Sequence, residues 1–273
     1  MKVTWESGDA YELYMGRWSR LVAKPFLDWL DPEPGLRWLD VGCGTGPLSD
    51  IILNHYKPAE LYAVDQSESF IKSAQLRLRQ GIQLRVGEAT ALPVEDAAVD
   101  ITVSGLLLNI PPDPDRVLRE MVRVTADSGS VAAYVWDYAG SMEMLNYFWD
   151  AAVELNLMAE VMHEGKRFAD CNKPALRQLF SDAGLADITL TSFEITQEFP
   201  DFEQFWGPFQ AGQGTAPTYL LQQPESDQAA LRELLREHLP TASDGSIRLR
   251  ARAWAIKGRV EKSLATPDDA TTD

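Results

Sequence analysis

The chain has 273 residues, and its 25 Lys and Arg against 41 Asp and Glu give a formal net charge of −16. Hydrophobic residues make up 45% and charged residues 24%, as in ordinary globular proteins, which excludes intrinsic disorder over most of the chain. The acidic excess argues against a protein that wraps nucleic acid, because phosphate binding needs clustered Lys and Arg. The length allows one large domain or two small ones.

Cysteine usage and the distribution of apolar residues indicate a cytoplasmic protein. Cys43 and Cys171 are the only cysteines, and their wide separation fits neither a disulfide framework nor a zinc site. No stretch approaches the ~18 consecutive apolar residues of a membrane span. The first residues carry Glu6 and Asp9 where a signal peptide would need an apolar run. We therefore expect no membrane span and no metal site.

Short apolar runs alternate with helical patterns along the first half of the chain. The predicted strands are 36–41, 61–65, 82–86, 99–104 and 131–136, and the predicted helices are 48–56, 67–80 and 116–124. Strands that alternate with helices pair in parallel through right-handed crossovers. The fold class predicted from this order is α/β, with a doubly wound and mostly parallel sheet.

The second half departs from the repeating pattern. A helix is predicted over 174–183, and the β-rich runs 188–199 and 247–259 predict an antiparallel edge hairpin. Two helix-prone segments rich in Met and aromatic residues interrupt this order, and we expect them to form helical cap insertions over the site. The predicted division is a cofactor-binding domain of 1–139, 171–199 and 247–262, a cap of 140–170 and 200–246, and a disordered acidic tail of 263–273.

The sharpest motif lies between the first predicted strand and the first helix. Gly42, Gly44 and Gly46 alternate there, which lets the backbone turn tightly and approach a ligand closely. Asp65 ends the next strand, where a carboxylate can accept hydrogen bonds from both hydroxyls of a ribose. The dinucleotide pattern requires a third glycine at the position of Pro47. The spacing therefore disfavours NAD(P), and Asp40 just before the turn favours a cationic amine over a pyrophosphate.

Four ordered stretches resemble the motifs of the class I, Rossmann-like S-adenosylmethionine-dependent methyltransferases. Residues 38–46 (WLDVGCGTG) resemble the first motif and 63–67 (AVDQS) the ribose-binding motif. Residues 87–96 (GEATALPVED) resemble the stretch that wraps the adenine, with Glu88 where the family usually has Asp, and 118–124 (LREMVRV) resembles the helix that follows. Within this family, the sequence looks like the small-molecule enzymes, including those of quinone biosynthesis.

The resemblance implies S-adenosylmethionine as cofactor and S-adenosylhomocysteine as product, and it gives each candidate residue a role. The glycine turn and the acid before it would hold the methionine amine, the residues after the second and third strands would bind the ribose and adenine, and an aromatic–Arg pair near the N-terminus would contact the methionine carboxylate. The predicted cofactor-binding residues are Tyr14, Arg17, Asp40, Gly42, Cys43, Gly44, Gly46, Asp65, Gln66, Glu88, Ala89 and Ser104.

The two predicted cap segments indicate where the methyl acceptor binds. Phe202, Phe205, Trp206 and Phe209 have the spacing of one helix face, which predicts an apolar pocket for a small apolar or planar acceptor. The two candidates for a general base are Asp137, with a turn residue as the equal alternative, and His163, which as a lone histidine is weak support. The sulfonium methyl is already activated, so in-line transfer without metal is expected.

Two other functions remain open at this point. One is an NAD(P)-dependent oxidoreductase on a related fold, and the other is a module that binds S-adenosylmethionine without catalysis. The sequence predicts a small-molecule methyl acceptor as partner and allows a homodimer. It predicts no nucleic-acid partner.

Overall fold

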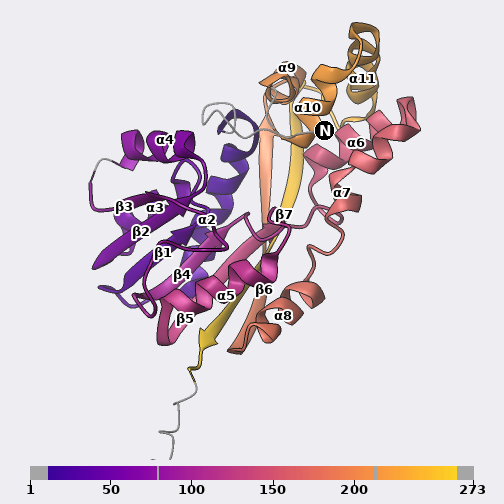
Figure 1. The fold of residues 1–273 in the computed structure, drawn as a ribbon. Coiled ribbons are helices and arrows are strands. Elements are labelled where there is room, and N and C mark those ends of the chain that lie inside the picture. Colours follow the sequence, from indigo (N-terminus) through magenta and orange to yellow (C-terminus); the bar gives the residue numbers. More distant parts are fainter. Residues whose placement is uncertain (1–11, 79, 212–213, 263–273) are drawn as a thin grey trace, which may run out of the picture.

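A seven-stranded sheet forms the centre of the computed structural model, which describes residues 12–78, 80–211 and 214–262 (Figure 1). Its strand order is β3-β2-β1-β4-β5-β7-β6. The strands are β1 (Arg37–Val41), β2 (Glu60–Asp65), β3 (Gln83–Val86), β4 (Val99–Gly105), β5 (Thr125–Trp136), β6 (Leu185–Phe199) and β7 (Ile247–Val260). The first five pair in parallel, whereas β7 is antiparallel to both β5 and β6. The predicted α/β class, parallel sheet and antiparallel hairpin are confirmed.

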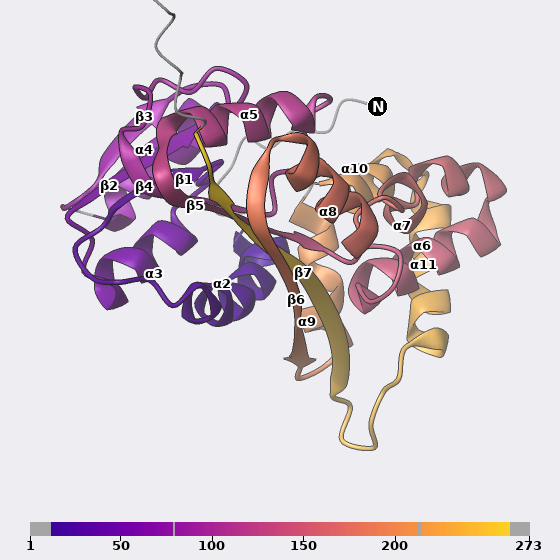
Figure 2. The ribbon, with the colours of Figure 1, turned by 90° about the horizontal axis from the view of Figure 1, so that it is seen from below.

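Helices cover both faces of this sheet, as the view from below shows (Figure 2). They are α2 (Arg17–Leu30), α3 (Pro47–His55), α4 (Glu68–Leu78), α5 (Pro114–Val124) and α8 (Lys173–Asp182). Helices α2 and α3 pack together on one face, and α5 and α8 pack together on the other. The apolar side of α5 is buried, and Asp113 caps its start by accepting a 2.9 Å hydrogen bond from the Arg116 N–H.

The cap is built on the outer half of the long β6–β7 hairpin (Figure 1). The segment after β5 forms α6 (Glu143–Leu155), the 3₁₀ helix η2 (Leu157–Met162) and α7 (Glu164–Arg167). The segment between β6 and β7 forms α9 (Phe202–Trp206), the 3₁₀ helix η3 (Gly207–Ala211), α10 (Thr215–Gln222) and α11 (Glu225–His238). Helix α6 packs on β7 and α11, and η3 meets the short π-helix η1 (Glu12–Gly16) that precedes α2. The cap and the N-terminal helices therefore share one core.

The aromatic stripe predicted as one helix face is divided between two short helices. Helix α9 ends at Trp206, and η3 continues to Phe209 in a tighter form, because Pro208 has no N–H to extend the α-helical pattern. All four aromatic side chains are nonetheless buried. The predicted tail of 263–273 lies outside the described residues. Within 12–78, 80–211 and 214–262, no helix combines the length and apolarity that crossing a bilayer would take.

Candidate active site

The glycine turn joins the end of β1 to the start of α3. Gly42, Gly44 and Gly46 have φ angles of 72°, 55° and 86°, a left-handed conformation that side chains with a Cβ rarely adopt. A Cβ on Gly46 would lie 2.7 Å from the Leu78 side chain, whereas one on Gly44 would meet nothing within 4 Å. The turn therefore needs all three glycines for its backbone conformation, and the position that a Cβ of Gly44 would occupy is open space.

A buried carboxylate lies directly beneath this turn. Asp40, the fourth residue of β1, is 1% exposed and accepts a 2.7 Å hydrogen bond from the Ser49 hydroxyl. Burial raises the pKa of Asp40 to about 7, despite that hydrogen bond, and the nearby charge of Asp65 adds to the effect. Among the described residues, Asp40 forms no ion pair. A cation bound above the turn would thus find a carboxylate that lacks a compensating charge.

Asp65 stands at the end of β2 beside the same turn. Its two carboxylate oxygens accept hydrogen bonds from the backbone N–H groups of Gly44, at 2.9 Å, and Ser67, at 2.8 Å. Burial raises the pKa of Asp65, and these two N–H groups oppose that shift. The carboxylate is therefore held in a fixed position between the glycine turn and the start of α4.

The predicted adenine-binding residues follow the neighbouring strand ends. Gln66 is exposed next to Asp65, and Glu88 and Ala89 come just after β3, with Glu88 exposed and Ala89 half-buried. The Gly87 N–H donates to the Asp65 carbonyl at 3.0 Å, which ties these two strand ends together. The structure thus brings Asp65, Gln66 and Glu88 to the same edge of the sheet.

A small cavity of about 40 Å³ separates the glycine turn from α2. It is lined by Ser19, Asp40, Gly42, Cys43, Gly44, Thr45, Pro47, Leu48, Gly105, Leu106 and Tyr134. Leu107 covers Gly42, with its side chain 2.9 Å from where a Cβ would lie. Asp65 and Glu88 are not among its lining residues, so this cavity marks only the part of the site next to the glycine turn.

Two predicted cofactor residues support the turn from within the protein. Ser104 is fully buried, and its hydroxyl donates to the Val41 carbonyl at 2.9 Å, which links β4 to the end of β1. Cys43 is buried as well, and burial raises the pKa of its thiol. Both side chains therefore shape the turn, and the Cys43 thiol stays protonated.

The predicted aromatic–Arg pair is split between two environments. Arg17 is exposed in the first turn of α2, whereas Tyr14 is 2% exposed and packs edge-on against Phe209 of the cap, with ring centroids 5.8 Å apart. Tyr14 is not among the residues that line the cavity at the glycine turn. Its ring belongs to the cap side of the site.

Both predicted base candidates have structural partners in the fold. Asp137 is buried after β5, where it accepts a hydrogen bond from the Gly140 N–H at 3.0 Å and pairs with Arg252 of β7 at 2.6 Å. These contacts favour the alternative of a turn residue. His163 caps α7 by accepting from the Gly165 N–H at 3.1 Å, and its other ring nitrogen lies 3.3 Å from Asp150. A base role for Asp137 or His163 stays a prediction.

A larger hollow, of about 330 Å³, opens at the opposite edge of the sheet. Residues near the start of the parallel strands line it, including Leu36, Asp100 and Ser130. Open α/β sheets bind ligands beyond the carboxyl ends of their strands, so the smaller cavity at the glycine turn is the candidate active site despite its size. No cluster of His, Cys, Asp and Glu suited to a metal ion occurs in the part of the chain that the structure describes.

Known proteins are similar to this chain in sequence and in fold. The family profile described as "Methyltransferase domain" matches residues 39–133, which run from β1 through most of β5. A demethylmenaquinone methyltransferase of Desulfitobacterium hafniense (strain Y51) is 31% identical over 116 residues, 40% of this chain and 46% of its own length. A malonyl-[acyl-carrier protein] O-methyltransferase of Halorhodospira halophila is 32% identical over 189 residues, 66% of this chain and 60% of its own length.

Residues 39–133 therefore form a methyltransferase domain, and this is the part of the chain whose motifs resemble those of the class I S-adenosylmethionine-dependent methyltransferases. A phosphoethanolamine N-methyltransferase of Haemonchus contortus, solved with S-adenosylhomocysteine, superposes with a TM-score of 0.55 at 15% identity, over 93% of this chain and 56% of its own. That likeness extends the methyltransferase fold beyond the matched domain. The chain spans about half the length of the curated relatives it matches. The residues that the family profile matches, 39–133, include the glycine turn and Asp65.

The structure also adds polar residues on the cap side that the sequence analysis missed. Glu164, the neighbour of His163, is buried and accepts a 3.0 Å hydrogen bond from the Trp149 indole N–H. Tyr138 follows β5, and the Asn109 amide donates to its hydroxyl at 3.4 Å. The only signal in the sequence was that Glu164 is a charged residue within a segment rich in Met and aromatic residues. Charged residues are rarely buried unless they have a partner.

Proposed function

We propose that the protein transfers the methyl group of S-adenosylmethionine to a small-molecule acceptor by direct in-line displacement, without a metal ion. One observation carries the proposal: the buried Asp40 carboxylate beneath the glycine turn has only a hydroxyl partner among the described side chains. S-adenosylmethionine supplies both an ammonium group and a methyl group activated by the sulfonium. The ammonium is the charge that Asp40 lacks.

Each residue of the cofactor half has a defined task in this proposal. Asp40 and the carbonyls of the glycine turn hold the ammonium, and the fixed carboxylate of Asp65 accepts hydrogen bonds from the ribose hydroxyls. Glu88 and the Ala89 N–H face the adenine edge from the end of β3. Gly44 leaves room for the ligand, since a Cβ there would fill open space.

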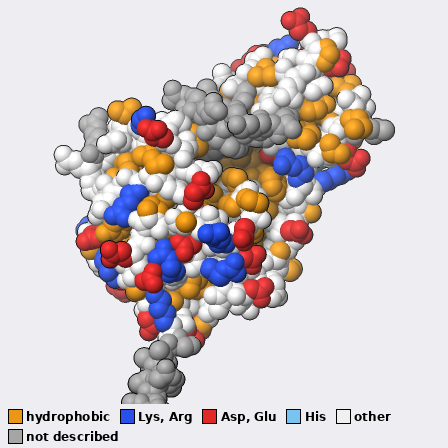
Figure 3. Space-filling model, in the orientation of Figure 1, with side chains coloured by type: hydrophobic (Ala, Val, Ile, Leu, Met, Phe, Trp, Pro, Cys, Tyr) orange, Lys and Arg blue, Asp and Glu red, His pale blue; other side chains and the backbone are white. Residues whose placement is uncertain are grey.

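The acceptor half excludes water and aligns the nucleophile. Figure 3 shows hydrophobic side chains in the hollow between the parallel-strand half of the molecule and the cap. Alignment of the nucleophile with the sulfur–methyl bond is the main catalytic requirement, and a closed apolar site favours a transition state in which charge is dispersed. The two relatives act, by their names, on demethylmenaquinone and on malonyl-[acyl-carrier protein]. This difference supports the proposal that the cap selects the acceptor.

Calorimetry tests the cofactor assignment directly. We expect S-adenosylmethionine and S-adenosylhomocysteine to bind at least about tenfold more tightly than NADH, a difference of about 1.4 kcal/mol. Tighter binding of NADH would overturn the proposal. Transfer of a labelled methyl group to members of a panel of small hydroxyl, amine and thiol acceptors then tests catalysis, and the absence of transfer despite tight binding would favour a module that only binds the cofactor. A homodimer and a cytoplasmic location stay predictions.

A further inference from the structure

A serine at the start of α3 holds the buried carboxylate beneath the glycine turn. The Ser49 hydroxyl donates to Asp40 at 2.7 Å, and both residues are at most 1% exposed. Ser49 is the third residue of α3 and Asp40 the fourth of β1, so the hydrogen bond joins the two elements that the turn connects. The contact therefore fixes the two ends of the turn relative to each other and holds the carboxylate in place.

The two partners of this hydrogen bond lie differently with respect to the small cavity at the turn. Asp40 lines that cavity of about 40 Å³, together with Gly42 and Gly44, whereas Ser49 is not among the lining residues. No other described side chain donates to Asp40. Ser49 thus reaches the carboxylate from the interior of the protein, while Asp40 faces the space in which we propose that the cofactor binds.

The hydroxyl also favours the ionised form of Asp40. Burial raises the pKa of Asp40 to about 7, the hydrogen bond from Ser49 opposes this rise, and the nearby charge of Asp65 adds to it. A hydrogen bond to a charged group favours the ionised form by about tenfold or more. Near neutral pH, the balance between the two forms of Asp40 therefore depends on this hydroxyl.

The other titratable groups around Asp40 come from the turn and from three further elements. Asp65 at the end of β2 acts on Asp40 by its charge, and the Cys43 thiol of the turn has a raised pKa and stays neutral. Tyr134 of β5 lines the same cavity, and Arg77 of α4 donates to a threonine hydroxyl of the turn at 3.5 Å. Asp65 is thus the neighbouring charge that any pH response of Asp40 includes.

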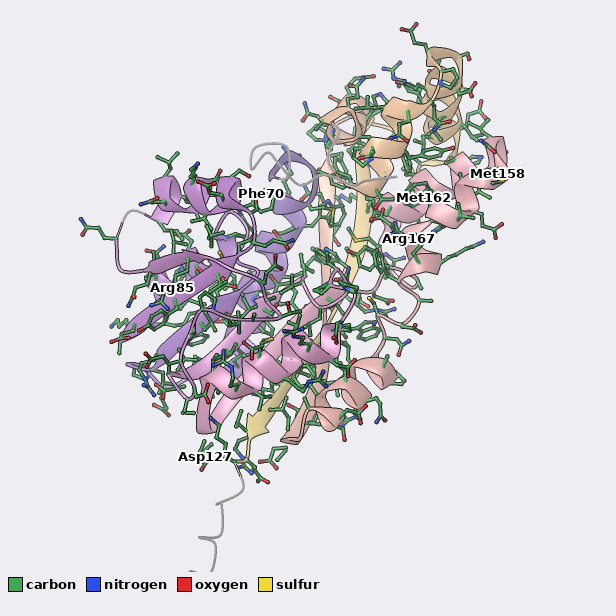
Figure 4. All side chains as sticks on the ribbon, viewed as in Figure 1. Phe70, Arg85, Asp127, Met158, Met162 and Arg167 are labelled. Carbon is green, nitrogen blue, oxygen red and sulfur yellow. The ribbon has the colours of Figure 1, made fainter. Side chains whose placement is uncertain are left out.

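The acidic residues of the larger hollow lie at the other end of the sheet. Asp127 lines that hollow, and Figure 4 shows it at the bottom of the molecule, whereas Phe70 of α4 lies near the top of the parallel-strand half. Helix α4 packs on the glycine turn, since a Cβ on Gly46 would lie 2.7 Å from Leu78. A changed pH response of Asp40 can therefore be assigned to the groups around the turn.

We propose that Ser49 is a positioning residue for cofactor binding, which holds the Asp40 carboxylate in the place and the charge state that the ammonium group of S-adenosylmethionine requires. A hydroxyl suits this task better than a basic side chain, because Lys or Arg at this place would cancel the charge that attracts the ammonium. The inference rests on the proposed function, since it names the residue through which that site presents its negative charge.

The first test measures stability without cofactor, in Ser49→Ala and in Thr102→Val as the matched control. Thr102 is a fully buried residue of β4 whose hydroxyl lies 2.6 Å from that of Thr125. Both variants lose a buried hydrogen bond and should be less stable in urea. Between about pH 6 and about pH 8, the unfolding constant of Ser49→Ala relative to wild type should rise at least about threefold, because Asp40 keeps its proton to higher pH. The control should show no such rise.

The second test measures binding of S-adenosylhomocysteine and of 5′-methylthioadenosine, which has the adenosine and the sulfur but no ammonium group. Ser49→Ala should bind S-adenosylhomocysteine at least about fivefold more weakly than wild type at about pH 7, and this ratio should shrink at least about threefold at about pH 8.5. Affinity for 5′-methylthioadenosine should change less than about twofold at either pH. Ser49→Thr keeps the hydroxyl and should restore the wild-type pH profile.

The double variant with Asp40→Asn shows whether the effect passes through the carboxylate. In the Asp40→Asn background, Ser49→Ala should change S-adenosylhomocysteine affinity by less than about twofold, because no charge is left for the hydroxyl to stabilise. A full additional loss would mean that Ser49 acts on the cofactor by another route, which would overturn the inference.

The outcomes separate this inference from the proposed function. If the wild-type protein does not bind S-adenosylhomocysteine, the proposed function fails and the inference fails with it. If wild type binds but Ser49→Ala binds equally well, or is weaker by the same factor at both pH values, only the inference is overturned. An equal loss of 5′-methylthioadenosine binding would likewise overturn it, because Ser49 would then only support the shape of the turn.

Discussion

Replacement of Asp40 by Asn tests the electrostatics of the glycine turn. Burial raises the pKa of Asp40 from 3.8 to about 7. The folded protein therefore binds a proton more tightly than the unfolded chain, and its stability falls as the pH rises between these two values. Asn keeps the shape and can still accept the hydrogen bond from Ser49, but it never ionises.

The magnitude follows from the two pKa values. Each unit of pKa difference corresponds to about 1.4 kcal/mol, so a rise from 3.8 to about 7 corresponds to about 4 kcal/mol. Below about pH 4 Asp40 is protonated in both the folded and the unfolded protein, so Asp40→Asn should be as stable as the wild-type protein. The stability that Asp40→Asn gains over the wild-type protein should grow between about pH 4 and about pH 7 and reach its full value above about pH 7.

Urea unfolding of the cofactor-free protein at about pH 5 and about pH 8 measures this difference as a change in the free energy of unfolding. Asp244→Asn is the matched control, because Asp244 is exposed and its pKa is lowered by hydrogen bonds from Ser246. The control should show no gain at high pH. If Asp40→Asn is no more stable relative to wild type at about pH 8 than at about pH 5, the buried charge is not the source of the pKa shift and the reasoning is wrong.

Further changes probe the cofactor half and the cap. S-adenosylmethionine should bind the wild-type protein more tightly as the pH rises toward about 7, and Asp40→Asn should bind weakly at every pH, as titration calorimetry would show. Asp65→Ala should weaken cofactor binding by about 1–3 kcal/mol and leave the fold intact; unchanged affinity with a collapsed thermal midpoint would contradict this. Glu120→Ala should cost about 1–3 kcal/mol of stability and also weaken cofactor binding, because Glu120 accepts from the Leu92 N–H at 2.7 Å and so holds the segment that we propose wraps the adenine. Trp206→Ala should destabilise the protein by about 3–5 kcal/mol in urea unfolding, since the side chain is 3% exposed; a loss of methyl transfer at full stability would instead make it a wall of the acceptor pocket.

The cofactor half could be predicted from sequence because its signals are local. The glycine turn needs positive φ at Gly42, Gly44 and Gly46, and strands that alternate with helices allow few topologies. Asp65 was placed correctly at a strand end for the same reason. The length of the strands was not predictable, since β5 begins at Thr125 through pairing with β4, a contact between distant segments.

The cap resisted prediction because its residues are positioned by contacts far apart in sequence. His163 was singled out as a histidine, and one of its ring nitrogens caps α7 while the other lies near Asp150. The adjacent Glu164 is equally buried and accepts a hydrogen bond from the Trp149 indole, a contact that no local pattern indicates. The spacing from Phe202 to Phe209 predicted one continuous helix, although Pro208 lies within it. Which side chains meet Tyr14 depends on how the cap packs on the N-terminal helices, and no local pattern encodes that packing.

The pairing of Phe199 with Ile247 makes the second cap segment an insertion at a single point of the sheet. These two residues are directly opposed in the ladder of β6 and β7, so the whole of 200–246 leaves and re-enters the sheet at one point. A tight turn of a few residues could close the same hairpin without altering any strand register. Insertions of different length and sequence can therefore be exchanged at this junction during evolution or in the laboratory, and a lineage can acquire new acceptors while the machinery that binds the cofactor stays unchanged.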